Sequence, residues 1–154
     1  AAAARENTAP GAAPVREVAE RVVSVVERTE AGAALVFEIE CAPQLMLSGS
    51  TEELSEILGA LVENAARFAR RRVRVLASAD EESACLAVED DGPGLQDWLA
   101  EEALIRGRRL DETGPGHGLG LAIARDLVEA RGGSIALKRS ELGGLEVRMI
   151  WPRA

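Results

Sequence analysis

The stretch Gly114-Pro115-Gly116-His117-Gly118-Leu119-Gly120, followed directly by Leu121-Ala122-Ile123-Ala124-Arg125-Asp126-Leu127, decides the fold. Four glycines in seven positions leave backbone N–H groups unshielded by side chains. The next segment predicts an amphipathic helix that ends at Gly132-Gly133. Unpaired N–H groups and the positive end of the helix dipole meet where such a helix begins. The stretch therefore predicts an anion site, but a flexible loop before an ordinary core helix explains it equally well. The apolar positions expected to face inward are Ala122, Ile123, Leu127 and Ala130.

Composition limits the classes of protein to which the chain can belong. A length of 154 residues predicts one domain, and 47% hydrophobic with 29% charged residues is typical of a soluble globular protein. The net charge of −8 and an aromatic content of two Phe and two Trp argue against nucleic-acid binding. No apolar run approaches membrane-spanning length, so we expect no direct membrane contact by this fragment. His117 is the only histidine, which argues against a metal site built from several histidines.

Hydrophobic periodicity predicts the elements on either side of this loop. Residues 1–14 are rich in alanine, glycine and proline, so we interpret them as a tail or linker before a single domain over 15–154. Helices are expected from Val15 to Glu30 and from a capping Ser50 to Phe68. The first has inward residues at 15, 18, 22, 25 and 26, and the second at Leu54, Ile57, Leu58, Leu61, Ala65 and Phe68.

Alternating residues predict strands around positions 35–39, 73–77, 86–88, 135–137 and 145–151, with a short extended piece at 45–47. The weakly patterned residues 95–116 predict a flexible lid. Helices alternate with strands that are mostly joined as hairpins. We therefore expect an α/β (α+β) two-layer sandwich, with a mixed, mostly antiparallel sheet covered on one face by about three helices.

Two polar clusters precede the glycine-rich stretch. Asn64 and Arg67 lie three residues apart on one helix face, where an amide oxygen suits Mg²⁺ and a guanidinium suits phosphate. Asp91-Gly92-Pro93-Gly94 follows an apolar strand, and an ionised carboxylate there could accept a hydrogen bond from the adenine amino group. Solvated helix residues and an acidic surface turn remain alternatives for the two clusters.

The order of these clusters resembles a known family. Asn64-Ala65-Ala66-Arg67-Phe68, then Asp91-Gly92-Pro93-Gly94, then Gly116-His117-Gly118-Leu119-Gly120-Leu121 resemble the N box and the two glycine boxes of one domain type. It is the catalytic, ATP-binding domain of sensor histidine kinases, in the superfamily shared with gyrase, Hsp90 and MutL. The resemblance runs from about residue 15 to Pro152.

The resemblance implies ATP and Mg²⁺ as cofactors, with Asn64 as metal ligand, Arg67 and Arg109 facing phosphates, and Asp91 reading adenine. The backbone around Gly118 would hold the phosphates. The residues implied at the nucleotide are Asn64, Arg67, Asp91, Gly92, Gly94, Arg109, Gly116, His117, Gly118, Leu119 and Gly120. The implied activity is transfer of the γ-phosphoryl group to a histidine on a separate dimerisation domain, with a response regulator downstream. The implied location is cytoplasmic, within an inner-membrane sensor.

One departure from the family pattern affects the chemistry. Ala60 occupies the position where the gyrase-like branch has a water-activating glutamate, and Glu63 should point about 100° away around the helix. We therefore expect transfer to a positioned acceptor rather than vigorous ATP hydrolysis, and no autophosphorylation by this chain alone. The alternatives are a serine/threonine kinase of the anti-sigma-factor type and a non-catalytic protein-binding module on the same fold.

Overall fold

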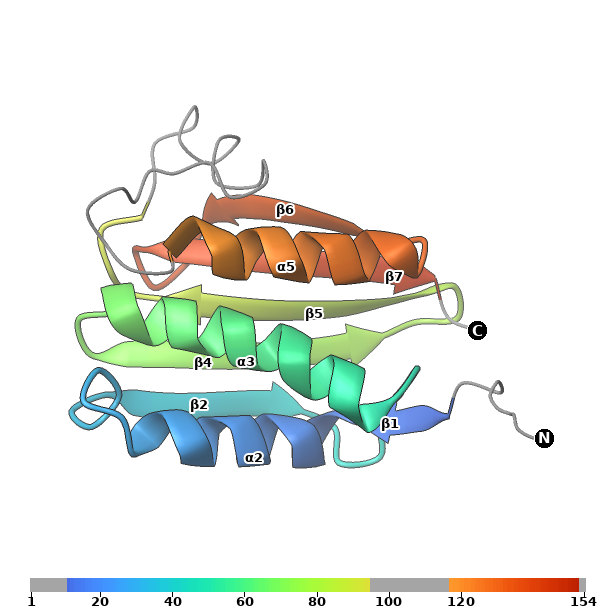
Figure 1. Cartoon of the computed structure of the whole chain (residues 1–154), viewed down its shortest axis with the longest axis horizontal. Coiled ribbons are helices and arrows are strands. Elements are labelled where there is room, and N and C mark those ends of the chain that lie inside the picture. The colour runs from blue at the N-terminus through green and yellow to red at the C-terminus, as the bar shows by residue number, and fades with distance from the viewer. Residues whose placement is uncertain (1–10, 95–116, 153–154) are drawn as a thin grey trace.

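A computed structural model describes residues 11–94 and 117–152, with side chains from Leu121 onward in the second range. Within these ranges, helices α2 (Val15–Glu27), α3 (Thr51–Phe68) and α5 (His117–Ala130) lie side by side over one face of a five-stranded sheet (Figure 1). The predicted two-layer α/β arrangement is therefore confirmed. The sheet contains β2 (Val36–Cys41), β4 (Arg72–Ala79), β5 (Ser83–Asp90), β6 (Ser134–Arg139) and β7 (Leu145–Pro152).

The strands follow the order β2-β4-β5-β7-β6. The β2–β4 pair is parallel, because the chain crosses over through α3 between the two strands, and the other three pairs are antiparallel. The sheet is thus mixed and mostly antiparallel, as predicted. This order places β5 in the centre, so the residues that follow it emerge between the beginnings of β4 and β7 (Figure 1).

The helix α3 begins as its sequence predicts. The Ser50 hydroxyl accepts a hydrogen bond from the Glu53 backbone N–H at 3.0 Å, which satisfies one of the unpaired N–H groups of the first turn. Its inner face is buried at Leu54, Ile57, Leu58, Leu61 and Ala65. The prediction for Phe68 was wrong, because this last residue of α3 is 39% exposed. Helical periodicity predicts on which face of a helix a residue lies, but not whether the neighbouring elements cover that face at the helix end.

The inward face of α5 matches the predicted one only in part. Ala122 is buried and Leu127 is half-buried against the core, as predicted, but Ile123 is 43% exposed and Ala130 is also exposed. The residues that are buried without having been predicted are Leu121, Ala124 and Val128. These three residues follow the i, i+3, i+7 spacing of a single face. The prediction chose a neighbouring stripe because this helix is apolar around much of its circumference.

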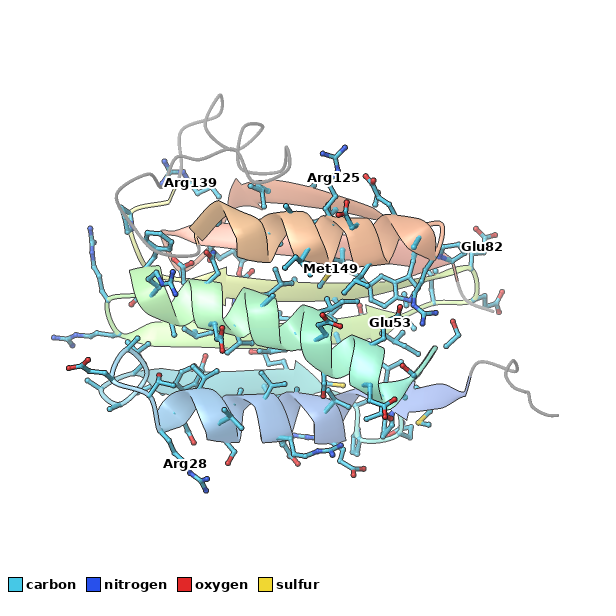
Figure 2. The ribbon with its side chains drawn as sticks, viewed as in Figure 1. Arg28, Glu53, Glu82, Arg125, Arg139 and Met149 are labelled. Carbon is cyan, nitrogen blue, oxygen red and sulfur yellow. The ribbon has the colours of Figure 1, made fainter. Side chains whose placement is uncertain are left out.

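The core lies between the helices and the sheet. Alternate residues of each strand point into it, such as Val73 and Val75 of β4 and Leu86 and Val88 of β5, and all four are at most 1% exposed. Met149 of β7, labelled in Figure 2, is fully buried in the same layer. Within the described part of the chain, no helix is long and apolar enough to cross a bilayer.

A small second sheet involves the last residues of the segment interpreted as a tail or linker. Residues Ala12–Pro14 form β1, which pairs antiparallel with β3 (Met46–Ser48), and Ala13 is 1% exposed. The domain boundary after residue 14 stays a prediction. Three residues carry no periodicity of their own, so this strand depends on a partner that lies far along the chain.

The sheet face opposite the helices carries a row of charged side chains. The register places Glu38, Arg74, Glu89 and Glu146 next to one another across β2, β4, β5 and β7. Arg74 donates to Glu89 Oε1 from Nη2 at 2.6 Å and from Nε at 3.1 Å. Burial raises the pKa of Glu89, and the hydrogen bonds from Arg74 oppose that rise. The two side chains therefore form a largely buried ion pair on the uncovered face.

Candidate functional site

The end of α3, the end of β5 and the beginning of α5 meet at one end of the molecule, on the left in Figure 1. Arg70 and Arg71, which follow α3, donate backbone N–H hydrogen bonds to Asp91 Oδ1 at 2.8 and 3.0 Å. Gly92 lies against the carbonyl of Phe68, since a Cβ built on it would be 2.2 Å from that oxygen. The three segments that carry the predicted polar residues are thus brought together.

Asn64 lies on the last two turns of α3 and is 8% exposed. Its amide has no hydrogen-bond partner among the described residues, and the amide atoms are not fully shielded from solvent. The alternative of a solvated helix residue does not fit this burial. The amide is therefore available to a ligand at this end of the molecule.

The neighbours of Asn64 on α3 separate into two directions. Arg67, three residues further on, is exposed and lies on the same side of the helix, as predicted. Glu63 instead lines a hollow of about 310 Å³ between α2 and α3, together with Arg21 and Val25. Glu63 thus points away from Asn64, as helix geometry predicts. Ala60 is half-buried, and its methyl group offers no base for water at its position.

Asp91 is engaged with the end of α3. Its Oδ1 accepts from two backbone N–H groups, and its Oδ2 accepts from the Arg71 N–H at 3.1 Å. Burial alone would raise the pKa of Asp91, but the hydrogen bonds from the backbone of Arg71, Arg72 and Arg70 together lower it. These contacts give Asp91 a structural role, while its role in reading adenine stays a prediction.

Asp90 is the carboxylate that the sequence interpretation missed. Asp90 alternates along β5 in step with Leu86 and Val88, so its side chain points to the helix-covered side of the sheet. It is 2% exposed. Its Oδ1 accepts backbone N–H bonds from Gly92 at 2.8 Å and Leu145 at 3.3 Å. No bond to its Oδ2 is recorded within the described ranges. Extending the alternation of β5 by one step would have identified it.

Burial also affects the ionisation of this group. The pKa of Asp90 is raised, chiefly because burial disfavours the charged form, and the negative charge of Asp91 adds to the rise. The N–H groups of Gly92 and Leu145 oppose it. A carboxylate with one oxygen fixed and the other unoccupied is suited to accept from a donor on a ligand.

The fold explains why glycine occupies both Gly92 and Gly94, which follow β5. Any side chain at Gly92 would collide with Phe68, as described above, and Gly94 has a φ of +75°, which favours glycine. Both residues were predicted to let a flat ring approach the backbone. The structure gives each glycine a reason within the fold, and the predicted contact with a ring stays a prediction.

The glycine-rich stretch is only partly described. Helix α5 begins at His117, so the backbone of His117, Gly118, Leu119 and Gly120 forms its first turn. The N–H groups of a first turn have no partner within the helix. The segment predicted to hold phosphates therefore lies at the start of α5, at the same end of the molecule as the ends of α3 and β5 (Figure 1). Gly116, Arg109 and the predicted lid at 95–116 lie outside the described residues.

A family model described as "Histidine kinase-, DNA gyrase B-, and HSP90-like ATPase" matches residues 49–154. The chain belongs to this family. The matched range contains the end of α3, the end of β5 and the start of α5, so family membership and the geometry point to the same end of the molecule. The resemblance inferred from the order of the three motifs is thereby confirmed.

Among curated members of the family, the chain is similar to two bacterial sensor kinases. It is 46% identical over 110 residues to the sensor protein kinase CarS of Pseudomonas aeruginosa, covering 71% of this chain and 25% of CarS. It is 29% identical over 140 residues to the sensor protein PhoQ of Escherichia coli, covering 91% of this chain and 29% of PhoQ. The chain thus spans about a quarter of the length of these relatives.

Solved structures of the family agree with the fold. The mycobacterial sensor histidine kinase MprB matches with a TM-score of 0.80 at 25% identity, covering 94% of this chain and 97% of that one. Full-length ShkA, solved in complex with AMPPNP, matches with a TM-score of 0.77 at 26% identity, covering 99% of this chain and 33% of that one. The catalytic domain of the histidine kinase ThkA matches with a TM-score of 0.78 at 20% identity, covering 93% and 97%, which supports the fold alone.

Proposed function

We propose that this chain binds Mg²⁺ and ATP and supplies the γ-phosphoryl group to a histidine on a separate dimerisation domain of the same sensor kinase. The observation that carries the proposal is the pair of polar groups that lie at one end of the molecule without described partners. These groups are the amide of Asn64 and the Oδ2 atom of Asp90. The similarity to ShkA, which was solved in complex with AMPPNP, supports the nucleotide class.

The base would be read by a carboxylate at the end of β5. We assign this role to Asp90 rather than to Asp91, because only Asp90 points to the helix-covered side and retains an oxygen without a described partner. A carboxylate accepts from the adenine 6-amino group, whereas it repels the 6-carbonyl of guanine. Discrimination of ATP from GTP is therefore the signature of this site.

The metal would be held by Asn64. Mg²⁺ keeps most of its water ligands and takes few protein ligands, so a single neutral oxygen is a sufficient protein contribution. The described residues contain no cluster of three or more His, Cys, Asp or Glu that could form a protein cage. When bound, Mg²⁺ neutralises negative charge on the phosphates. The first turn of α5 would contribute backbone N–H groups, and Arg67 and Arg109 would contribute guanidinium groups.

The chain's own groups favour transfer over hydrolysis. In the transfer, the bond from the γ-phosphorus to the bridging oxygen breaks, an acceptor nitrogen bonds to phosphorus, and ADP leaves with the electron pair. Ala60 offers no base for a competing water, and Glu63 points toward α2. Catalysis would then come from positioning and charge neutralisation. A response regulator would take the phosphoryl group next, and the domain would act in the cytoplasm, where ATP is available.

Titration calorimetry tests the binding step. Wild-type chain is titrated with ATP and with GTP, each with Mg²⁺ and with EDTA. We expect preference for ATP, and we expect Asn64→Ala to weaken ATP binding about tenfold in Mg²⁺ but little in EDTA. Glu63→Ala is the matched control, because it removes a polar side chain from the adjacent position. Absence of ATP binding, or equal affinity for both bases, would contradict the proposal.

A transfer assay separates the kinase classes. The chain is incubated with γ-labelled ATP and either a histidine-bearing two-helix fragment or a candidate partner protein. Phosphohistidine is labile to acid, so acid-labile label on the helical fragment would support the proposal. Acid-stable phosphate on the partner would instead identify the serine/threonine kinase alternative.

A further inference from the structure

The turn between β6 and β7 packs against the end of β5. Ser140 donates its backbone N–H to the Gly144 carbonyl at 2.8 Å, and its hydroxyl accepts the Leu142 N–H at 2.8 Å. Gly143 closes the turn by donating to the Ser140 carbonyl at 2.9 Å. Ser140 is 4% exposed, so the turn is tied down from within.

The closest approach of this turn to the candidate site is at Gly144. A Cβ built on Gly144 would be 2.3 Å from Asp90 Oδ1, 2.5 Å from the Gly92 nitrogen and 2.6 Å from the Asp90 carbonyl oxygen. All three distances are shorter than any real Cβ contact, and two of the atoms belong to the backbone. Only a residue without a side chain fits here unless the turn and β5 move apart.

The next residue supplies one of the two bonds that hold Asp90. Leu145 donates its backbone N–H to Asp90 Oδ1 at 3.3 Å, and Gly92 donates to the same oxygen at 2.8 Å. Both donors lie on one side of the carboxylate, so the opposite oxygen is the one left for a ligand. The close approach at Gly144 is what brings the Leu145 donor within range.

We propose that Gly144 is a positioning residue for base recognition, and that the turn Ser140–Gly144 brings the Leu145 N–H to Asp90 Oδ1 so that Oδ2 faces the nucleotide. This inference rests on the proposed function of the site. In this proposal Gly144 does not contact the nucleotide, and it affects base recognition only through Asp90. Any side chain at this position rotates or displaces the carboxylate and removes the selectivity for adenine.

The test compares Gly144→Ala with two other glycine-to-alanine variants. Gly143→Ala strains the same turn, because Gly143 has a φ of +106°, but its added methyl group meets nothing within 4 Å. Gly59→Ala adds a methyl group in open space on α3. Titration calorimetry with ATP and with GTP, and thermal unfolding, are measured for each. We expect Gly144→Ala to weaken ATP binding about tenfold or more and to change GTP binding much less.

A double-mutant cycle shows whether Gly144 acts through Asp90. In an Asp90→Asn background, Gly144→Ala should weaken ATP binding by less than about twofold, because the group that it positions has already been changed. Ser140→Ala adds no volume and loosens the turn, so it should weaken ATP binding several-fold in a folded protein. It keeps the inference testable if Gly144→Ala does not fold.

The outcomes are distinguishable from a failure of the proposed function. If the wild-type chain does not bind ATP, the proposed function itself is wrong. If the wild type prefers ATP and Gly144→Ala keeps both its affinity and its preference, the inference about Gly144 is overturned. A loss of ATP affinity in Gly59→Ala equal to that in Gly144→Ala would overturn it too, since Gly59 lies on α3, outside the turn.

Discussion

Replacement of Asp90 by asparagine should change which base the site prefers. Asparagine has nearly the same shape as aspartate, but one of its two terminal atoms is a donor. The N–H groups of Gly92 and Leu145 both point at Oδ1, so the amide oxygen will take that position. The amide NH₂ then occupies the position of Oδ2. In the proposed site this is the atom that faces the base.

The magnitude follows from these contacts. The flipped amide would leave two buried N–H groups without acceptors, at about 1 kcal/mol each at the low end, so it would be populated about thirtyfold less. ATP then loses a charge-assisted hydrogen bond and meets a donor instead, which weakens its binding about tenfold to hundredfold. The guanine carbonyl gains a donor, so GTP should bind about three- to tenfold more tightly.

Titration calorimetry with ATP and GTP in Mg²⁺ at pH 7.5 measures both changes, and Asp91→Asn is the matched control. The control should keep its preference for ATP, because the Asp91 carboxylate is occupied by the backbone of Arg70 and Arg71. An unchanged preference in Asp90→Asn would refute the assignment. A reversed preference in Asp91→Asn would return the role to Asp91.

Three further predictions concern stability, and thermal or urea unfolding measures each. Arg74→Met leaves Glu89 buried beside Glu146 without its cation, so we expect the free energy of unfolding to fall by about 3 kcal/mol and Tm to fall by about 6–12 °C. Adding Glu89→Gln to this variant should restore most of the lost stability. Because burial raises the pKa of Glu89, the loss of stability in Arg74→Met should become smaller as the pH falls from 8 to 5. An equal loss at pH 8 and pH 5 would contradict this prediction. Asp91→Ala should cost about 1–2 kcal/mol. The folded-state pKa of Asp91 is lowered, so its contribution is complete above about pH 4 and is lost as the pH falls through that folded pKa; a constant difference from wild type would refute this. Leu58→Ala should cost about 2–5 kcal/mol, since Leu58 is fully buried, and a cost below about 1 kcal/mol would refute the packing.

Local patterns predicted most of the layers. The Ser50 cap, the inner face of α3 and the alternation along β4 and β5 depend on periods of 3.6 and 2, which can be read from a few residues. The same local periods place the three predicted motifs on α3, β5 and α5, and these segments meet at one end of the fold. Asn64 lies beside the apolar stripe of its helix, and the glycine-rich stretch opens the next helix.

The features that local patterns did not predict depend on contacts between segments that are distant in the sequence. The strand at Ala12–Pro14 exists because Met46–Ser48 pairs with it, and the 39% exposure of Phe68, the last residue of α3, does not follow from the helical period. The assignment of adenine recognition to Asp91, for which we propose Asp90 instead, depended on a different kind of information. The sequence has both residues side by side, and only the parity of β5 distinguishes the direction of one carboxylate from that of the other.

The run Glu89-Asp90-Asp91 raises a difficulty for any site that binds a polyphosphate, since three adjacent carboxylates would repel it. The fold separates them. Glu89 points to the uncovered face, where Arg74 compensates its charge, and Asp91 is turned to the backbone N–H groups that follow α3. Only Asp90 faces the helix-covered side, where burial raises its pKa and two N–H groups hold it. A strand that alternates direction at every residue can therefore present one carboxylate to a base without directing a cluster of negative charge at its phosphates.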